Sequence, residues 1–226
     1  MEGTLVGGRA LEALGPLVAG LRAGNAAGVA PGLRAGTQDG WASVEDMPLE
    51  EMIQAAAERW SAPPHVAAAL WWKGFSYWTA LPVVMGWAMT RRVPVMTMET
   101  TAVLPLSEAP HMLIGLIEPQ VAPGEGRIIR ETLIEGLHAP VIERLNALTR
   151  AGRRGLWGSV AEAFVEPFDL LGMPGAAGAE ELTAAVGGPI AGLIDMTSGR
   201  RRTCCLWVTL PGNDACPTCC VKEPAC

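Results

Sequence analysis

Apolar residues recur at intervals of three or four along most of the chain, which is the spacing of a helix with one buried face. This pattern predicts helices over residues 10–23, 47–60, 127–150, 156–171 and 182–194. Pro140 falls inside the third of these stretches, so we expect it to kink or split that helix. The stretch 24–40 is rich in Gly and Pro and lacks the pattern, which predicts a loop.

The stretch 65–89 is apolar on all sides and long enough to span a membrane. Its sequence is HVAAALWWKGFSYWTALPVVMGWAM. Lys73 and Pro82 interrupt this stretch, and no second span accompanies it. We therefore predict two buried helices that meet near Pro82, in preference to a membrane span. The tryptophans still allow peripheral contact with a membrane surface.

Two stretches have the composition of strands. VPVMTMETTAVLPL (93–106) is rich in Val, Thr and Met, HMLIGLIEP (111–119) is a short apolar run, and SEAP between them is typical of a turn. Together they predict an antiparallel pair. The fold class expected is therefore α+β, with a helix-dominated body and a small antiparallel sheet over residues 1–199, followed by a short cysteine-rich segment at 200–226.

Composition narrows the classes of function. The 226 residues are 50% hydrophobic, which suits one large domain with a short appendage. A net charge of -6 argues against non-specific binding of nucleic acid, which needs a face rich in Lys and Arg. The first residues, MEGTLVGGRALEAL, lack the basic start and apolar run of a secretory signal, so we expect a reducing cytoplasm, with at most peripheral contact at the inner face of the membrane.

All six cysteines lie at the end of the chain, at positions 204, 205, 216, 219, 220 and 226. In a reducing compartment such a group is typical of metal ligands or redox centres, whereas a disulfide framework is typical of secreted chains. Cys216 and Cys219 form a C-x-x-C unit that can present both thiolates to one metal. The side chains of adjacent Cys204 and Cys205 tend to diverge, which favours a two-iron cluster over a single zinc ion.

The residues between the cysteines, LWVTLPGNDA, predict a strand at 206–210 and then a Pro-Gly turn that returns Cys216 to the side of Cys204 and Cys205, near the surface. Arg200, Arg201 and Arg202 precede the cysteines. These arginines either offset the negative charge of the thiolates or form an ordinary run of solvated charges.

The stretch RRTCCLWVTLPGNDACPTC resembles the C-terminal signature C-C-x10-C-x2-C of the FhuF-like ferric-siderophore reductases. Shorter similarities lie in LGPLVA, EGLHAPVIERL and LWGSVAEAF. The resemblance implies that a [2Fe-2S] cluster is bound by four residues: Cys204, Cys205, Cys216 and Cys219. It also implies that the protein reduces a cytoplasmic ferric siderophore by one electron and releases Fe(II). Cys220 and Cys226 fall outside the signature, and Cys220 is a candidate for ligand swapping or oxidation.

The sequence lacks a nucleotide or flavin fingerprint, so the electrons are expected from a ferredoxin, a flavodoxin-like protein or a dedicated reductase. Candidate contacts to the siderophore are Trp71, Trp78, His138, Arg201 and Arg202. Two other functions stay open. One is a binding or adaptor protein in which the same four cysteines hold zinc, and the other is an electron carrier without a siderophore site.

Overall fold

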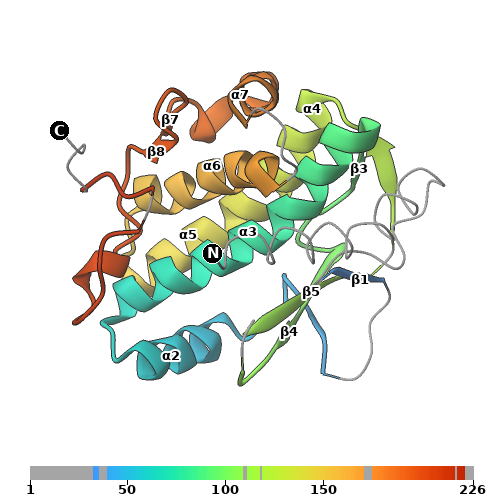
Figure 1. Ribbon diagram of the computed structural model, residues 1–226. Helices are drawn as coiled ribbons and strands as arrows, with labels where there is room; N and C mark the ends of the chain where they lie inside the picture. The colour runs from blue at the N-terminus through green and yellow to red at the C-terminus, as the bar shows by residue number, and fades with distance from the viewer. Residues whose placement is uncertain are drawn as a thin grey trace.

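The computed structural model describes residues 33–35, 40–108, 111–117, 119–170, 175–216 and 218–221. The fold is α+β, with a helix-dominated body and small antiparallel sheets, as predicted. The helices α3 (Pro64–Thr90) and α6 (Arg153–Leu170) pack side by side in the centre, and the sheet of β4 and β5 lies at one end of the body (Figure 1). The predicted helix over 10–23 lies outside the described residues.

The first described helix, α2 (Leu49–Trp60), follows Pro48, whose missing N–H would be unpaired in a first turn in any case. Leu49, Met52, Ile53 and Ala56 form its buried face, so the predicted helix at this position is confirmed. It ends where Ser61 adopts a left-handed conformation, φ 47°. The buried face packs on α3.

Helix α3 (Pro64–Thr90) is a single helix, so the expected break into two helices at Pro82 is wrong. The residues around Pro82 are buried, from Thr79 to Trp87, and packing against α2 and α6 outweighs the hydrogen bond that the proline removes. The helix is apolar on all sides because it is surrounded by other elements. Within the described part of the chain, no helix has the length and apolar character needed to cross a membrane.

The predicted antiparallel pair is confirmed as β4 (Thr101–Pro105) and β5 (Met112–Leu116), in which Val103 lies opposite Ile114. The four-stranded sheet has the order β1-β5-β4-β2, with β2 at Ala42–Ser43 and β1 at Leu33–Ala35. Strand β1 pairs parallel to β5, so the stretch 24–40 is not entirely a loop as expected. A second pair joins β3 (Arg92–Pro94) to β6 (Val121–Pro123), so residues 93–106 belong to two different sheets rather than to one strand.

The predicted helix over 127–150 runs from α4 (Gly126–Ile129) through a π-helical segment (Arg130–His138) into α5 (Ala139–Thr149). Pro140 lies in the first turn of α5 and has no N–H to offer the carbonyl of Gly136. The N–H of Met98 donates to that carbonyl instead, at 2.9 Å. The helix therefore changes its hydrogen-bond pattern at the proline and continues, with the lost partner replaced from the loop before β4.

Helix α6 confirms the predicted helix over 156–171, whereas the one over 182–194 is only partly correct. Helix α7 (Gly175–Val186) ends at Gly187 and Gly188, both with positive φ, which favours glycine. Beyond it, β7 (Ile194–Asp195) pairs with β8 (Arg200–Arg201). Ile190 and Ile194 are buried without being helical in the predicted sense, so the apolar spacing there reflects burial alone.

Candidate metal centre

The cysteine segment follows β8 and packs at one end of the body, where α3 begins (Figure 1). A 3-10 turn occupies Trp207–Thr209, so the predicted strand at 206–210 is wrong: Leu206 has a φ of 67° and turns the chain before a strand can form. The predicted Pro211-Gly212 turn is present, with the N–H of Asn213 bonded to the carbonyl of Leu210 at 3.2 Å. This turn returns the chain toward its start.

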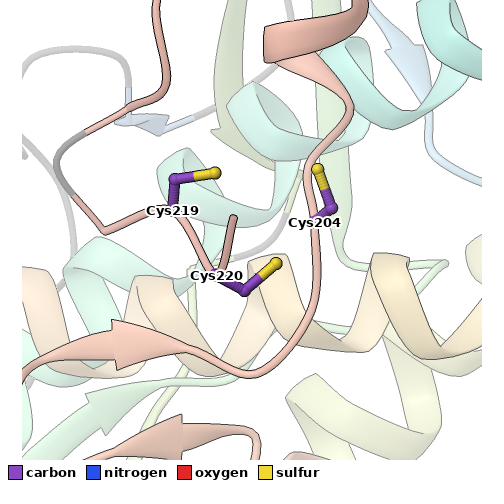
Figure 2. Close-up of side chains that lie close together, drawn as sticks. All are labelled: Cys204, Cys219 and Cys220. Atoms are coloured by element: carbon purple, nitrogen blue, oxygen red, sulfur yellow. The ribbon is translucent and has the colours of Figure 1, made fainter. Parts of the chain in front are cut away.

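The return brings the thiols of Cys205 and Cys216 together, with 3.9 Å between the two Sγ atoms. A second group contains Cys204, Cys219 and Cys220, whose Sγ atoms all lie within 4.8 Å of one another (Figure 2). The adjacent Cys204 and Cys205 thus belong to different groups, as expected for consecutive side chains. Cys226 lies outside the described residues.

Exposure differs within each group. Cys205 and Cys219 are buried, Cys204 and Cys216 are half-buried, and Cys220 is exposed. Backbone N–H groups approach two of the sulfurs: Leu206 donates to Sγ of Cys204 at 3.3 Å, and Val221 to Sγ of Cys219 at 3.4 Å. Hydrogen bonds of this kind stabilise negative charge on sulfur.

A charge network centred on the buried Glu162 ties the cysteine segment to the body. Nη1 of Arg201 lies 2.9 Å from Oε2 of Glu162 on α6, and Nζ of Lys73 on α3 lies 3.0 Å from the same oxygen. The hydroxyl of Thr218, in the C-x-x-C turn, donates to Oε1 of Glu162. The network joins α3, α6, β8 and the turn between Cys216 and Cys219 through one carboxylate.

The network contains two cations and one anion, so it keeps an excess of positive charge next to the thiols. Burial by itself would raise the pKa of Glu162, but the charges of Lys73 and Arg201 and the Thr218 bond outweigh burial and lower it. Burial would lower the pKa of Lys73, and Glu162 reverses that effect and raises it. The positive charge of Lys73 also acts on Cys216 and favours its thiolate form.

The ionised thiols need such compensation. Burial, and then the neighbouring Cys205, raises the pKa of Cys216. Burial, followed by Cys204, likewise raises the pKa of Cys220. A cation bound among the sulfurs would lower these pKa values and release protons, which is how thiolate metal sites form.

Two glycines of α6 let the cysteine segment approach closely. A Cβ atom at Gly158 would collide with Oγ1 of Thr203, the residue before Cys204. At Gly155 a Cβ atom would lie 3.4 Å from the carbonyl oxygen of Cys204, which is near contact. The Gly155 carbonyl also accepts a hydrogen bond from Nη2 of Arg201 at 3.2 Å.

A hollow of about 210 Å³ opens between α3 and α6 beside this network. Its lining residues are Lys73, Gly74, Tyr77, Ser159, Glu162, Ala163 and Glu166. Burial, with a smaller contribution from Glu166, raises the pKa of Tyr77 to about 12, so its phenol stays a hydrogen-bond donor at all ordinary pH values. The hollow borders the same Glu162 that Thr218 contacts, so it adjoins the cysteine segment.

The predicted siderophore contacts differ in their exposure. Trp71, His138 and Arg201 are buried, with 4%, 0% and 2% exposure, so their side chains stabilise the interior. Trp78 is half-buried and packs edge-on against Tyr77, which lines the hollow, while Arg202 is exposed. His138 Nε2 lies 2.8 Å from Oγ1 of Thr79, and burial lowers its pKa to about 3.

Sequence reasoning missed Lys73, Tyr77, Glu162 and Thr218 as parts of the site. Lys73 carried a signal, because it is one charge within the apolar stretch 65–89, and a charge there needs a partner. The partner, Glu162, lies 89 positions later on another helix, and nothing in the sequence around it identified it as the partner.

The arrangement of the thiols is the main guide to the function of this protein. No protein-family model matches the chain, and no curated protein matches it.

Proposed function

We propose that the protein is a ferric-siderophore reductase that carries a [2Fe-2S] cluster on Cys204, Cys205, Cys216 and Cys219. The observation that carries the proposal is the division of these thiols into two groups, Cys205 with Cys216 at 3.9 Å and Cys204 with Cys219 within 4.8 Å. A [2Fe-2S] cluster with four cysteine ligands takes two thiolates on each iron. A single zinc ion needs all four donors around one point, which this division suits less well.

The surroundings of the thiols fit a cluster that carries negative charge. Lys73 and Arg201 supply two positive charges against the one of Glu162, and backbone N–H groups donate to two of the sulfurs. When bound, the cluster supplies a one-electron carrier at low potential, near ~-400 mV for plant-type centres. Positive charge and N–H donors near the sulfurs favour the reduced form and so raise the potential.

The substrate is a ferric ion held by the hard oxygen ligands of a siderophore. One electron converts Fe(III) to Fe(II), a softer ion that such ligands hold less well, so the iron is released. An external donor, which we expect to be a ferredoxin, a flavodoxin-like protein or a dedicated reductase, supplies that electron. No acid, base or nucleophile of this chain is needed for the step.

The hollow between α3 and α6 is the proposed docking place for the chelate. Its volume of about 210 Å³ is smaller than the roughly 300–1,000 Å³ typical of pockets for drug-sized ligands, so it suits one arm of a siderophore rather than the whole. Tyr77 offers a phenol and Lys73 an ammonium group to the oxygens of that arm. The rest of the chelate would lie on the surface toward the cysteines.

A single-turnover experiment tests the proposal. Protein purified without oxygen is reduced with half a molar equivalent of dithionite, which supplies one electron per chain, and is mixed with a ferric trihydroxamate, while Fe(II) is trapped by ferrozine. We expect one Fe(II) per chain, formed as the oxidised visible spectrum returns. Cys216→Ser, which removes one proposed ligand, is the matched control. Fe(II) release no faster than from this variant would refute the reductase, and a colourless protein with one zinc per chain would favour the zinc-binding alternative.

A further inference from the structure

Cys220 gives the cysteine segment one thiol more than a four-ligand cluster uses. Its Sγ lies within 4.8 Å of those of both Cys204 and Cys219, and Figure 2 shows the three side chains close together on two irregular stretches of the segment. Cys205 and Cys216 form their own pair at 3.9 Å. The five described thiols therefore divide into a set of three and a set of two.

We propose that Cys204, Cys219 and Cys220 form a second metal site, which takes a single soft, thiolate-preferring ion of the Cu(I) class. Thiolate ligands select Cu(I), zinc and iron-sulfur centres. Zinc in structural sites takes four protein ligands, and within the described part of the chain this group has no fourth cysteine, histidine or carboxylate. Cu(I) accepts three thiolates, so three converging thiols match it better than zinc.

The surroundings suit an ion entering from solvent. Cys220 is exposed, Cys204 is half-buried and Cys219 is buried, so the group runs from the surface inward. Nε and Nη2 of Arg200 donate to the carbonyl of Cys219 at 3.2 and 2.8 Å, which places a positive guanidinium beside a site whose three thiolates outweigh one Cu(I) charge. The amide of Leu206 donates to Sγ of Cys204.

The ion and the cluster would exclude each other, a consequence that rests on the proposed function. Both need Cys204 and Cys219, whereas only the ion needs Cys220 and only the cluster needs Cys205 and Cys216. Cu(I) bound first would hold two cluster ligands and block assembly of the cluster. Cys220 would thus make the apo protein sensitive to soft metals.

The experiment uses all 226 residues of this chain, free of the cluster and with Cys226→Ser, reduced and kept without oxygen. Cu(I) is added in competition with bicinchoninate, whose Cu(I) complex is coloured. We expect one Cu(I) per chain in this background and in Cys216→Ser, and at least a tenfold weaker affinity in Cys220→Ser. Circular dichroism checks that each variant is folded, and substitution of the exposed Cys220 should leave the fold intact.

Equal loss of Cu(I) affinity in Cys216→Ser and Cys220→Ser would overturn the site, and so would unchanged affinity in Cys220→Ser. A second arm loads iron and sulfide afterwards. Prior Cu(I) should block cluster assembly in the Cys226→Ser background and leave it intact in Cys220→Ser. If no cluster forms even without Cu(I), the reductase proposal fails while the Cu(I) result still decides the three-thiol site.

Discussion

Arg201 and Glu162 meet in the interior, with 2.9 Å between Nη1 and Oε2, an arginine side chain that is 0% exposed and a glutamate side chain that is 8% exposed. Arg201 lies three positions before Cys204, and Glu162 lies on the central helix α6. The same carboxylate accepts the hydroxyl of Thr218 in the C-x-x-C turn. Both halves of the cysteine segment are therefore held by one buried group.

Removing the charge of Glu162 should destabilise the fold strongly. Glu162→Gln leaves Arg201 and Lys73 without a counter-charge, and breaking a buried pair in this way costs about 3–5 kcal/mol. Urea unfolding followed by circular dichroism measures the loss. Glu143→Gln is the matched control because it breaks an arginine pair, with Arg153, whose side chains are 57% and 53% exposed. Similar losses from the two variants would contradict a structural role for the buried network.

The free energy of unfolding should decrease as the pH is lowered, because of His138. Burial lowers its pKa to about 3 in the folded state, against 6.5 for the ordinary group. Its neutral form is required for folding, so its contribution is complete above pH 6.5 and is lost progressively as the pH falls toward 3. The slope contributed is about 1.4 kcal/mol per pH unit.

Urea unfolding at pH 7 and pH 5 tests this dependence. His138→Asn should remove that part of the slope, whereas His65→Asn, at an exposed position, should leave it unchanged. The same slope in all three proteins would show that His138 is not the titrating group.

The close packing of the cysteine segment against α6 depends on Gly158. Gly158→Ala places a methyl group against Thr203, and overpacking of this kind costs about 1–3 kcal/mol. We expect lower stability and less iron retained per chain after desalting. Gly155→Ala, one helical turn earlier, brings its methyl group only to 3.4 Å from Cys204 and should retain more iron. Equal iron content in the two variants would contradict the close packing of the cysteine segment at Gly158.

The proposed docking hollow predicts a specific effect of Tyr77. Tyr77→Phe keeps the ring and removes the phenol hydroxyl, so it should weaken binding of a ferric siderophore about two- to tenfold, the value of one hydrogen bond. Quenching of tryptophan fluorescence measures Kd with the oxidised protein. Thr90→Val removes a hydroxyl at the far end of the same helix and should leave Kd unchanged. If both variants bind as the parent protein does, the chelate docks elsewhere.

Local sequence patterns predicted the helices and strands that depend mainly on the residues within them. Helices α2 and α6 present regular apolar faces, and β4 and β5 are close to each other in the sequence, so spacing and composition identified them. Long-range packing decided the rest. Pro82 stays inside α3 because neighbouring helices hold it, and Pro140 stays inside a helix because Met98 replaces its missing donor.

The candidate site was predictable only in part. The spacing of the cysteines and the Pro-Gly turn predicted that Cys216 returns to the side of Cys204 and Cys205. The structure brings Cys216 to Cys205, whereas Cys204 groups with Cys219 and Cys220. The approach of Cys220 to Cys204 depends on how the chain folds back after Thr218, which local spacing does not encode. Likewise, Lys73, Glu162 and Arg201 come from three distant segments, so their meeting is a property of the fold.

The most direct test of the central claim is the visible spectrum, with the iron and sulfide content, of protein purified without oxygen. A [2Fe-2S] cluster predicts two irons and two sulfides per chain and a brown-red colour that bleaches with dithionite. The variants Cys205→Ser and Cys216→Ser should lose the colour, and Cys220→Ser should keep it. A colourless protein, or a cluster that survives in Cys216→Ser, would contradict the account.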